Sequence, residues 1–132
     1  MSKTKILFHI INAIFIIFYV YPGSILGYLI YGDFNKQPQV TADFGLSFIE
    51  VSSNHVYALA LLSMLGFINY YKSHKYLIII YFFMISIILE GLHLVIPNRG
   101  FQFSDLFGNI VGVMLSLLII NLVNFWRKNE HI

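Results

Sequence analysis

Four long apolar runs, separated by short polar segments, limit this chain to very few folds. They cover residues 6–31, 51–71, 76–96 and 106–126. Each run meets or approaches the ~20 residues that an α-helix needs to cross ~30 Å of hydrocarbon. They lack the alternation of apolar and polar residues that membrane barrel strands require. The runs therefore predict an all-α, polytopic membrane protein with four transmembrane helices, forming a single domain over residues 1–132.

Composition supports this class and excludes several functions. Hydrophobic residues make up 58% of the chain and charged residues 11%, which is well outside the range of soluble domains. The net charge of +2 comes without a basic cluster of the kind that binds nucleic acid, so no nucleic-acid partner is expected. The chain contains no cysteine, which removes disulfides, thiolate zinc sites and cysteine nucleophiles.

The first run contains a break at Pro22. Lys3 and Lys5 followed by an apolar stretch resemble a secretory signal, but the stretch is long and no small-x-small cleavage site follows it where expected. We therefore expect this run to be retained. A proline disfavours helix at the preceding residue and lacks a backbone N–H. The helix should bend or stop at Tyr21, with residues 25–31 continuing as a half-helix or an interfacial segment.

Basic residues set the expected orientation. They precede the first run, lie between the second and third runs, and follow the fourth: Lys3, Lys5, Lys72, Lys75, Arg127 and Lys128. In a four-span chain these three places fall on one side of the membrane, which the positive-inside rule makes cytoplasmic. Both termini are then predicted to be cytoplasmic, whereas the loop of residues 32–50 and the turn of residues 97–104 face outward. We expect a multi-pass protein of the cell membrane.

Polar residues inside the runs recur at helical spacing. Ser86, Glu90 and His93 follow at steps of four and three, so they share one face of the third helix. The same rule places five residues on one face of the fourth helix: Asp105, Gly108, Asn109, Gly112 and Ser116. Ionisable residues at membrane depth usually face protein or a wet cavity, so these faces should meet at the outer end of the bundle. The expected polar cluster consists of His55, Glu90, His93, Arg99, Asp105 and Asn109.

Three further expectations concern helix contacts. Gly112 should allow a neighbouring helix to approach closely, because packing drives helix association in lipid. Asn109, on the same stripe, is expected to hold Asp105, His93 or the ligand by hydrogen bonds. His9 and Asn12 lie one turn apart near the inner end of the first run, and such residues usually bond to a neighbouring helix.

The residues of the cluster resemble the motifs of the VanZ-like family of small bacterial membrane proteins. The resemblance covers about residues 51–126. It rests on Glu90-x-x-His93-x-x-x-Pro97-x-Arg99, on Asp105-x-x-x-Asn109-x-x-Gly112, and on Ser53-Asn54-His55 as an upstream histidine motif. It implies a multi-span protein of the bacterial inner membrane. The family's founding member is linked to tolerance of the antibiotic teicoplanin, and relatives look like components of cell-envelope and surface-polysaccharide systems, but the resemblance supplies no biochemical activity.

Arg99 has three possible roles. It could anchor at the interface, with its guanidinium among head-group phosphates. It could pair with Glu90 or Asp105 as a structural ion pair, and Arg99 and Glu90 should then be energetically coupled. A planar guanidinium also suits bidentate binding of phosphate or carboxylate, and on this interpretation Arg99, His55 and Asn109 are the expected ligand-binding residues.

The remaining residues suggest acid–base chemistry or structure. Glu90, His93 and Asp105 are the candidate catalytic residues, because a buried carboxyl beside an imidazole can share a proton. Glu90 and His93 could also bind a metal with His55 and Asp105, but known di-iron bundles use the Glu-x-x-His motif twice and it occurs once here. No metal and no cofactor are therefore expected. Asp105 is also expected to be the N-cap of the fourth helix.

Three functions remain open for such a cluster. The first is a cell-envelope factor whose outward pocket binds an anionic lipid-linked group or one related to peptidoglycan or polysaccharide. The second is a small membrane-embedded hydrolase or transferase acting on such a group. The third is a structural subunit of an envelope complex, in contact with a partner membrane protein or with a second copy of this chain. Membrane lipid is an expected partner in each case.

Overall fold

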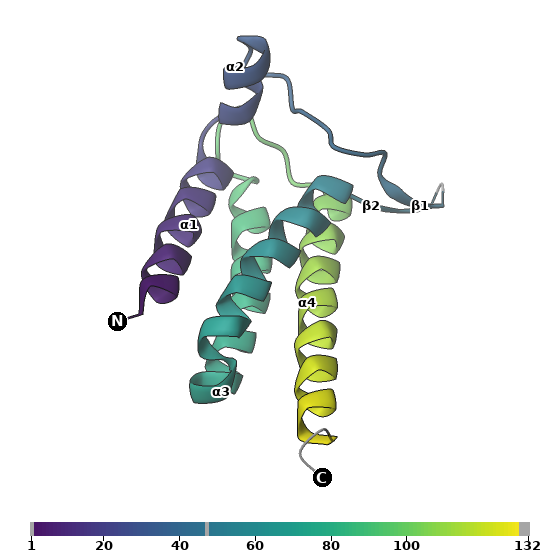
Figure 1. The fold of residues 1–132 in the computed structure, drawn as a ribbon. Helices are drawn as coiled ribbons and strands as arrows, with labels where there is room; N and C mark the ends of the chain where they lie inside the picture. The colour runs from purple at the N-terminus through teal and green to yellow at the C-terminus, as the bar shows by residue number, and fades with distance from the viewer. Residues whose placement is uncertain (1, 47, 130–132) are drawn as a thin grey trace.

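The computed structural model describes residues 2–46 and 48–129, and helices dominate these residues (Figure 1). The elements within these ranges are α1 (Lys3–Val20), α2 (Ile25–Tyr31), β1 (Phe44–Leu46), β2 (Ile49–Val51), α3 (Ser53–Leu92) and α4 (Phe103–Asn129). Of the described helices, α1, α3 and α4 are long and apolar enough to cross a membrane. The prediction of long apolar helices is therefore confirmed.

α3 consists of two antiparallel segments. Its backbone leaves helical geometry at His74 (φ −141°, ψ 50°), and Figure 1 shows the chain reversing there. In a straight helix, positions 67 and 82 would lie ~22 Å apart. The rings of Phe67 and Phe82 instead pack with their centroids 5.4 Å apart. The two segments correspond to the second and third apolar runs, and each approaches the ~20 residues of a membrane span.

The break expected at Pro22 is present. α1 ends just before Tyr21, which takes an extended conformation (φ −64°, ψ 134°), as the steric demand of a following proline requires. The Ser24 hydroxyl caps α2 by accepting a hydrogen bond from the Gly27 backbone N–H at 2.9 Å. A Cβ on Gly27 would collide with the Lys36 carbonyl, so the following loop lies directly against α2. This short helix covers one end of the bundle (Figure 1).

A small β-hairpin in the long loop departs from the all-α prediction. β1 and β2 are antiparallel, with Phe44 opposite Val51. Strands of three residues are shorter than the four to eight residues over which an alternating pattern can be read. β2 leads directly to α3, and the Ser52 backbone N–H bonds the Ser104 carbonyl at 2.9 Å. This bond ties the start of α3 to the start of α4.

The helix of the third run ends at Leu92, earlier than the predicted residue 96. Tight turns follow, in which the His93 N–H bonds the Glu90 carbonyl at 3.1 Å. A helical conformation is disfavoured immediately before Pro97, and Asn98 takes a positive φ of 58°. The chain therefore turns back over the bundle before α4 begins.

Glycines on α4 bring it into close contact with the first segment of α3. A Cβ on Gly112 would lie 2.5 Å from the Val56 carbonyl oxygen and 2.9 Å from the Ala60 backbone nitrogen. The Ser116 hydroxyl, one turn further on, donates a hydrogen bond to the Ala60 carbonyl at 2.6 Å. The predicted close approach at Gly112 is confirmed.

Replacing Gly112 by leucine should therefore lower the amount of folded protein. A side chain here meets backbone atoms that cannot move aside, and overpacking of this kind costs about 1–3 kcal/mol or more. Fluorescence-detected size-exclusion chromatography of tagged protein would measure the loss of the folded peak. Gly91→Leu is the matched control, since a Cβ at Gly91 meets no atom within 4 Å in the described chain. Equal folded yields for the two variants would contradict this packing.

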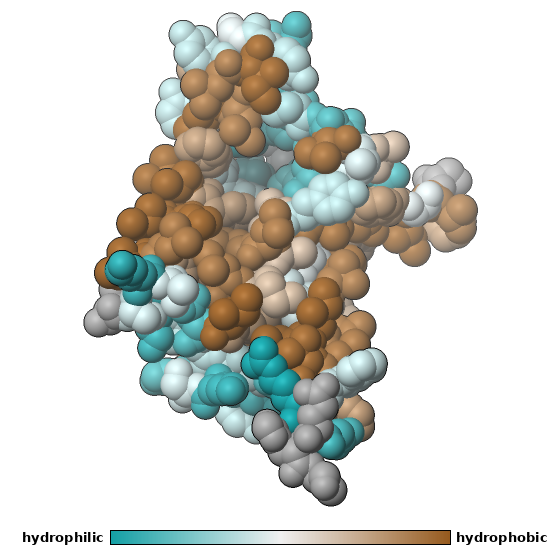
Figure 2. All heavy atoms as spheres, viewed as in Figure 1, coloured by the Kyte–Doolittle hydropathy of each residue, from teal (hydrophilic) through white to brown (hydrophobic). Residues whose placement is uncertain are grey.

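The outer surface is apolar along the middle of the molecule. Figure 2 shows hydrophobic residues across this middle region and hydrophilic residues gathered toward both ends. Large side chains contribute to the exposed apolar surface, among them Leu61 and Leu118, which are 75% and 56% exposed. Contiguous apolar surface of this extent marks a membrane or protein contact rather than a water-facing surface.

Candidate functional site

The hydroxyl of Tyr19 lies at the centre of the polar cluster. It accepts a hydrogen bond from Asn109 Nδ2 at 2.7 Å, donates one to Glu90 Oε2 at 2.8 Å, and lies 3.0 Å from His55 Nδ1. Tyr19 is 7% exposed, whereas Glu90 and Asn109 are fully buried. This one hydroxyl therefore joins α1 to both segments of α3 and to α4.

Tyr19 was not among the residues predicted from the sequence. Its only signal is helical spacing. Asn12 follows His9 by three residues and Tyr19 follows Asn12 by seven, which places all three on one face of α1. A tyrosine near the end of an apolar run is usually an interfacial anchor, so this spacing alone does not identify a site residue. The predicted residues of α3 and α4 meet as expected, and α1 supplies the member that joins them.

The hydrogen bonds of Asn109 fix the tautomer of His55. Asn109 Nδ2 faces the Ser86 carbonyl at 3.3 Å, and a carbonyl only accepts, so this side of the amide is the NH₂ group. The amide oxygen Oδ1 therefore faces His55 Nδ1 at 3.0 Å, and this nitrogen must carry a hydrogen. In neutral His55 the lone pair is then on Nε2, which lies 3.5 Å from Asp105 Oδ2.

His93 and Glu90 form a buried ion pair. His93 Nε2 lies 2.9 Å from the Tyr19 carbonyl and must donate to it. Nδ1 lies 3.3 Å from Glu90 Oε2, where a lone pair would be repelled unless this nitrogen is also protonated. Burial opposes the charged ring, but its hydrogen bonds to Glu90 and to the Tyr19 carbonyl outweigh burial and raise the pKa of His93 above its ordinary value. Glu90 also accepts a bond from the Gln102 N–H at 2.8 Å.

Arg99 binds the end of α1. Its Nε donates to the Tyr21 carbonyl at 3.1 Å and its Nη2 to the Phe18 carbonyl at 3.0 Å. The last carbonyls of a helix lack partners within the helix and form the negative end of its dipole, so they attract a cation. Partial burial lowers the pKa of Arg99 below its usual value, but a guanidinium stays charged at neutral pH.

The predicted ion pair of Arg99 with Glu90 or Asp105 is wrong. Among the described residues, the carboxylate of Glu90 pairs with His93 and that of Asp105 pairs with His55. The prediction that Asp105 caps α4 is also wrong, because α4 begins at Phe103 and Asp105 lies in its first turn. A carboxylate in the first turn still interacts favourably with the helix dipole.

A cavity of about 580 Å³ opens beside the cluster. Figure 2 shows the surface hollowed between α1, α2 and the start of α3. His55, His93 and Arg99 line this cavity with Tyr19, whereas the other predicted residues, Glu90, Asp105 and Asn109, are not among its lining residues. The polar lining is completed by Ser24, Gln37 and Asn54. The apolar lining is formed by Ile11, Ile14, Phe15, Phe18, Ile25, Leu26, Ile30, Val40 and Ala58, with Pro38 and Tyr57 beside them.

This arrangement can bind an anion, and it can hold a proton or a cation between Asp105 and His55. Three residues offer ligand atoms that lie within 4.8 Å of one another: His55, Glu90 and Asp105. Of the four residues considered from the sequence, His93 is missing from this set, because both of its ring nitrogens are already engaged.

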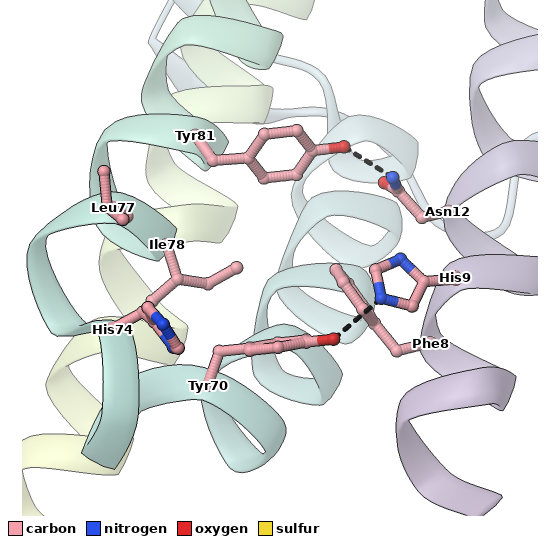
Figure 3. A pocket seen from close by; sticks show the side chains of 8 residues that line it. All are labelled: Phe8, His9, Asn12, Tyr70, His74, Leu77, Ile78 and Tyr81. Atoms are coloured by element: carbon pink, nitrogen blue, oxygen red, sulfur yellow. Dashed lines mark hydrogen bonds between the residues drawn. The ribbon is translucent and has the colours of Figure 1, made fainter. Parts of the chain in front are cut away.

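A second, smaller cavity of about 370 Å³ lies between α1 and the α3 segments nearer the His74 turn (Figure 3). His9 Nε2 lies 2.7 Å from the Tyr70 hydroxyl, and Asn12 Nδ2 donates to the Tyr81 hydroxyl. Figure 3 shows both pairs bridging the two helices. The expectation that His9 and Asn12 bond to a neighbouring helix is confirmed.

Comparisons of the chain with models of known protein families, with curated proteins and with solved structures found no match. The resemblance to the VanZ-like family therefore rests on the motif residues alone.

Proposed function

We propose that this chain is a four-span, VanZ-like protein of the cell membrane that holds the anionic head group of a membrane amphiphile in its 580 Å³ cavity. The composition of the cavity carries this proposal. Imidazole and guanidinium groups line it together with aliphatic and aromatic side chains of α1 and α2. An amphiphile with a negatively charged head group complements both kinds of lining.

The arrangement of the helices supports the membrane part of the proposal. The start of α1, the turn at His74 and the end of α4 lie at one end of the bundle (Figure 1). The basic residues of the chain fall mainly in these three places, which is the pattern of a cytoplasmic side. The cavity, lined by residues of α2 and the following loop, is then extracytoplasmic.

The hydrogen bonds of Arg99 support an anionic ligand. Its Nε and Nη2 hold carbonyls of α1, and no hydrogen bond to Nη1 is present in the described part of the chain. Because both carboxylates of the cluster lie beside imidazoles rather than beside the guanidinium, the charge of Arg99 remains available to a phosphate or carboxylate in the cavity. Lipid-linked precursors of the cell envelope carry such groups, and the family resemblance favours this setting.

Native mass spectrometry of the purified protein with added lipids tests the proposal. The probes are a polyprenyl phosphate, phosphatidylglycerol and phosphatidylcholine. The wild type should retain at least one anionic probe in preference to phosphatidylcholine. Arg99→Gln should reduce this retention at least tenfold, because a hydrogen bond to a charged group contributes about 1.5–3 kcal/mol.

Two further variants separate charge from shape. Arg99→Lys keeps the positive charge and should retain more anionic lipid than Arg99→Gln. Ile14→Trp should fill the cavity and reduce retention without changing any charge, since Ile14 lines the cavity and is 46% exposed. Arg127→Gln, at the opposite end of the bundle, is the control and should bind as the wild type does. Equal retention of all three probes, or retention unaffected by Arg99→Gln and Ile14→Trp, would exclude the proposed ligand.

A further inference from the structure

We propose that His55, Glu90 and Asp105 bind a divalent transition-metal ion, with zinc as the best match. The three residues come from both segments of α3 and from α4, and their ligand atoms lie within 4.8 Å of one another. Imidazole nitrogen and carboxylate oxygen are both ligand types that zinc accepts, and a catalytic zinc site has three protein ligands. The inference is independent of any ligand in the cavity.

The spacing between His55 and Asp105 fits a shared ion better than a direct bond. Their Nε2 and Oδ2 atoms lie 3.5 Å apart, whereas a charge-assisted N–H···O bond is usually ~2.7–2.9 Å long. Two ligands at ~2.0–2.2 Å from a tetrahedral zinc lie ~3.3–3.6 Å from each other. A small movement of the Glu90 carboxylate would add the third ligand.

The surroundings of His55 prepare Nε2 to bind a metal. Its Nδ1–H donates to Asn109 Oδ1 at 3.0 Å, so the lone pair of the neutral ring is on Nε2, the nitrogen that lies 3.5 Å from Asp105 Oδ2. A hydrogen bond from the far ring nitrogen is the usual support of a metal-binding histidine, because it fixes both the tautomer and the ring orientation. A lone pair this close to a carboxylate is repulsive, and a cation bound to both groups would remove the repulsion.

Glu90 retains the capacity to bind as well. A carboxylate has about four acceptor positions, and Glu90 uses three, for Tyr19, His93 and the Gln102 N–H. A divalent ion would balance the two carboxylates of the set, and the protonated His93 beside Glu90 would leave the group with one net positive charge. Three protein ligands would leave one position of the metal open for water or for an oxygen of another molecule.

Metal analysis of the purified protein tests this site. The protein is prepared with an affinity tag that binds no metal, stripped with a chelator, and titrated with Zn²⁺ against a chromophoric chelator. We expect one equivalent of bound Zn²⁺ and an increase in melting temperature. Co²⁺ should give the intense visible absorption of a four-coordinate site.

Variants assign the ligands. His55→Gln and Asp105→Asn should each weaken Zn²⁺ affinity at least tenfold and abolish the thermal shift. The control is His74→Gln, which changes an exposed histidine in the turn of α3 and should bind as the wild type does. Each variant is compared by size-exclusion profile first, so that loss of folding is not read as loss of metal. Absence of stoichiometric Zn²⁺ in folded wild type, or Zn²⁺ binding by His55→Gln and Asp105→Asn equal to that of the wild type, would overturn the proposal.

Discussion

Replacing His93 by glutamine should destabilise the protein by about 3–5 kcal/mol, because the change leaves the carboxylate of Glu90 buried without its cation. Glu90 is fully buried and His93 is 4% exposed, so water cannot replace the lost partner. The double change with Glu90→Gln should recover a large part of this loss, since it leaves two neutral amides in place of a single charge. Unfolding free energies in detergent, arranged as a double-mutant cycle, measure the coupling.

A second cycle distinguishes this pair from the one expected from the sequence. Arg99 and Glu90 do not form an ion pair in the described chain, so their coupling should be much weaker than that of Glu90 and His93. Coupling of several kcal/mol in the Arg99 cycle, together with additive effects in the His93 cycle, would contradict the structure. Such a result would mean that Arg99, rather than His93, neutralises the carboxylate of Glu90.

Helical periodicity was sufficient to predict most of the cluster. Spacing places Glu90 and His93 on one face of a helix and Asp105 and Asn109 on one face of another, and burial of polar groups in lipid requires such faces to meet. The effect of Pro22 was equally predictable, because the restriction it imposes is local. These features depend only on residues close together in the sequence.

The missed features depend on contacts between distant residues. Periodicity gives the face that a helix presents, but not the rotation and height of a neighbouring helix, so the place of Tyr19 against the cluster was not predictable. Arg99 has a long side chain that reached carbonyls of α1 instead of the nearby acids. The opposite charges of Arg99 and the nearby acids therefore indicated an ion pair from the sequence, whereas in the structure Arg99 binds the unpaired carbonyls at the end of α1.

The cluster divides into residues that border the cavity and residues that lie behind them. His55, His93 and Arg99 border the cavity, whereas Glu90 and Asn109 lie behind them, fully buried. Changes to the buried part should alter stability first, because unpaired polar groups in a low-dielectric interior are costly. Asn109 bonds Tyr19, His55 and Ser86 instead of the expected Asp105 or His93, and it does not line the cavity.

Tyr19→Phe should show how strongly the cluster depends on one hydroxyl. The phenylalanine ring can keep the stacking of Tyr19 on His93, whose ring centroids lie 4.8 Å apart. The change removes the shortest hydrogen bond of Asn109 Nδ2 and that of Glu90 Oε2, which keep only the Ser86 carbonyl and the His93 ring, each at 3.3 Å. A lost hydrogen bond costs about 0.5–1.5 kcal/mol between neutral groups and about 1.5–3 kcal/mol to a charged one. We therefore expect a lower unfolding free energy and, through the freed Asn109 amide and His55 ring, weaker Zn²⁺ binding at the proposed site.

Tyr57→Phe provides the matched control for this last prediction. Its hydroxyl lies 2.9 Å from Thr41 Oγ1 in an exposed pair, so water can replace the lost bond and the cost should stay below about 1 kcal/mol. Both variants remove one oxygen from a tyrosine that lines the same cavity. A difference between them would therefore reflect the buried partners of Tyr19 rather than the loss of a hydroxyl as such. Equal and small effects would mean that the carboxylate and the amide find other partners, and that α1 is not held by this hydroxyl.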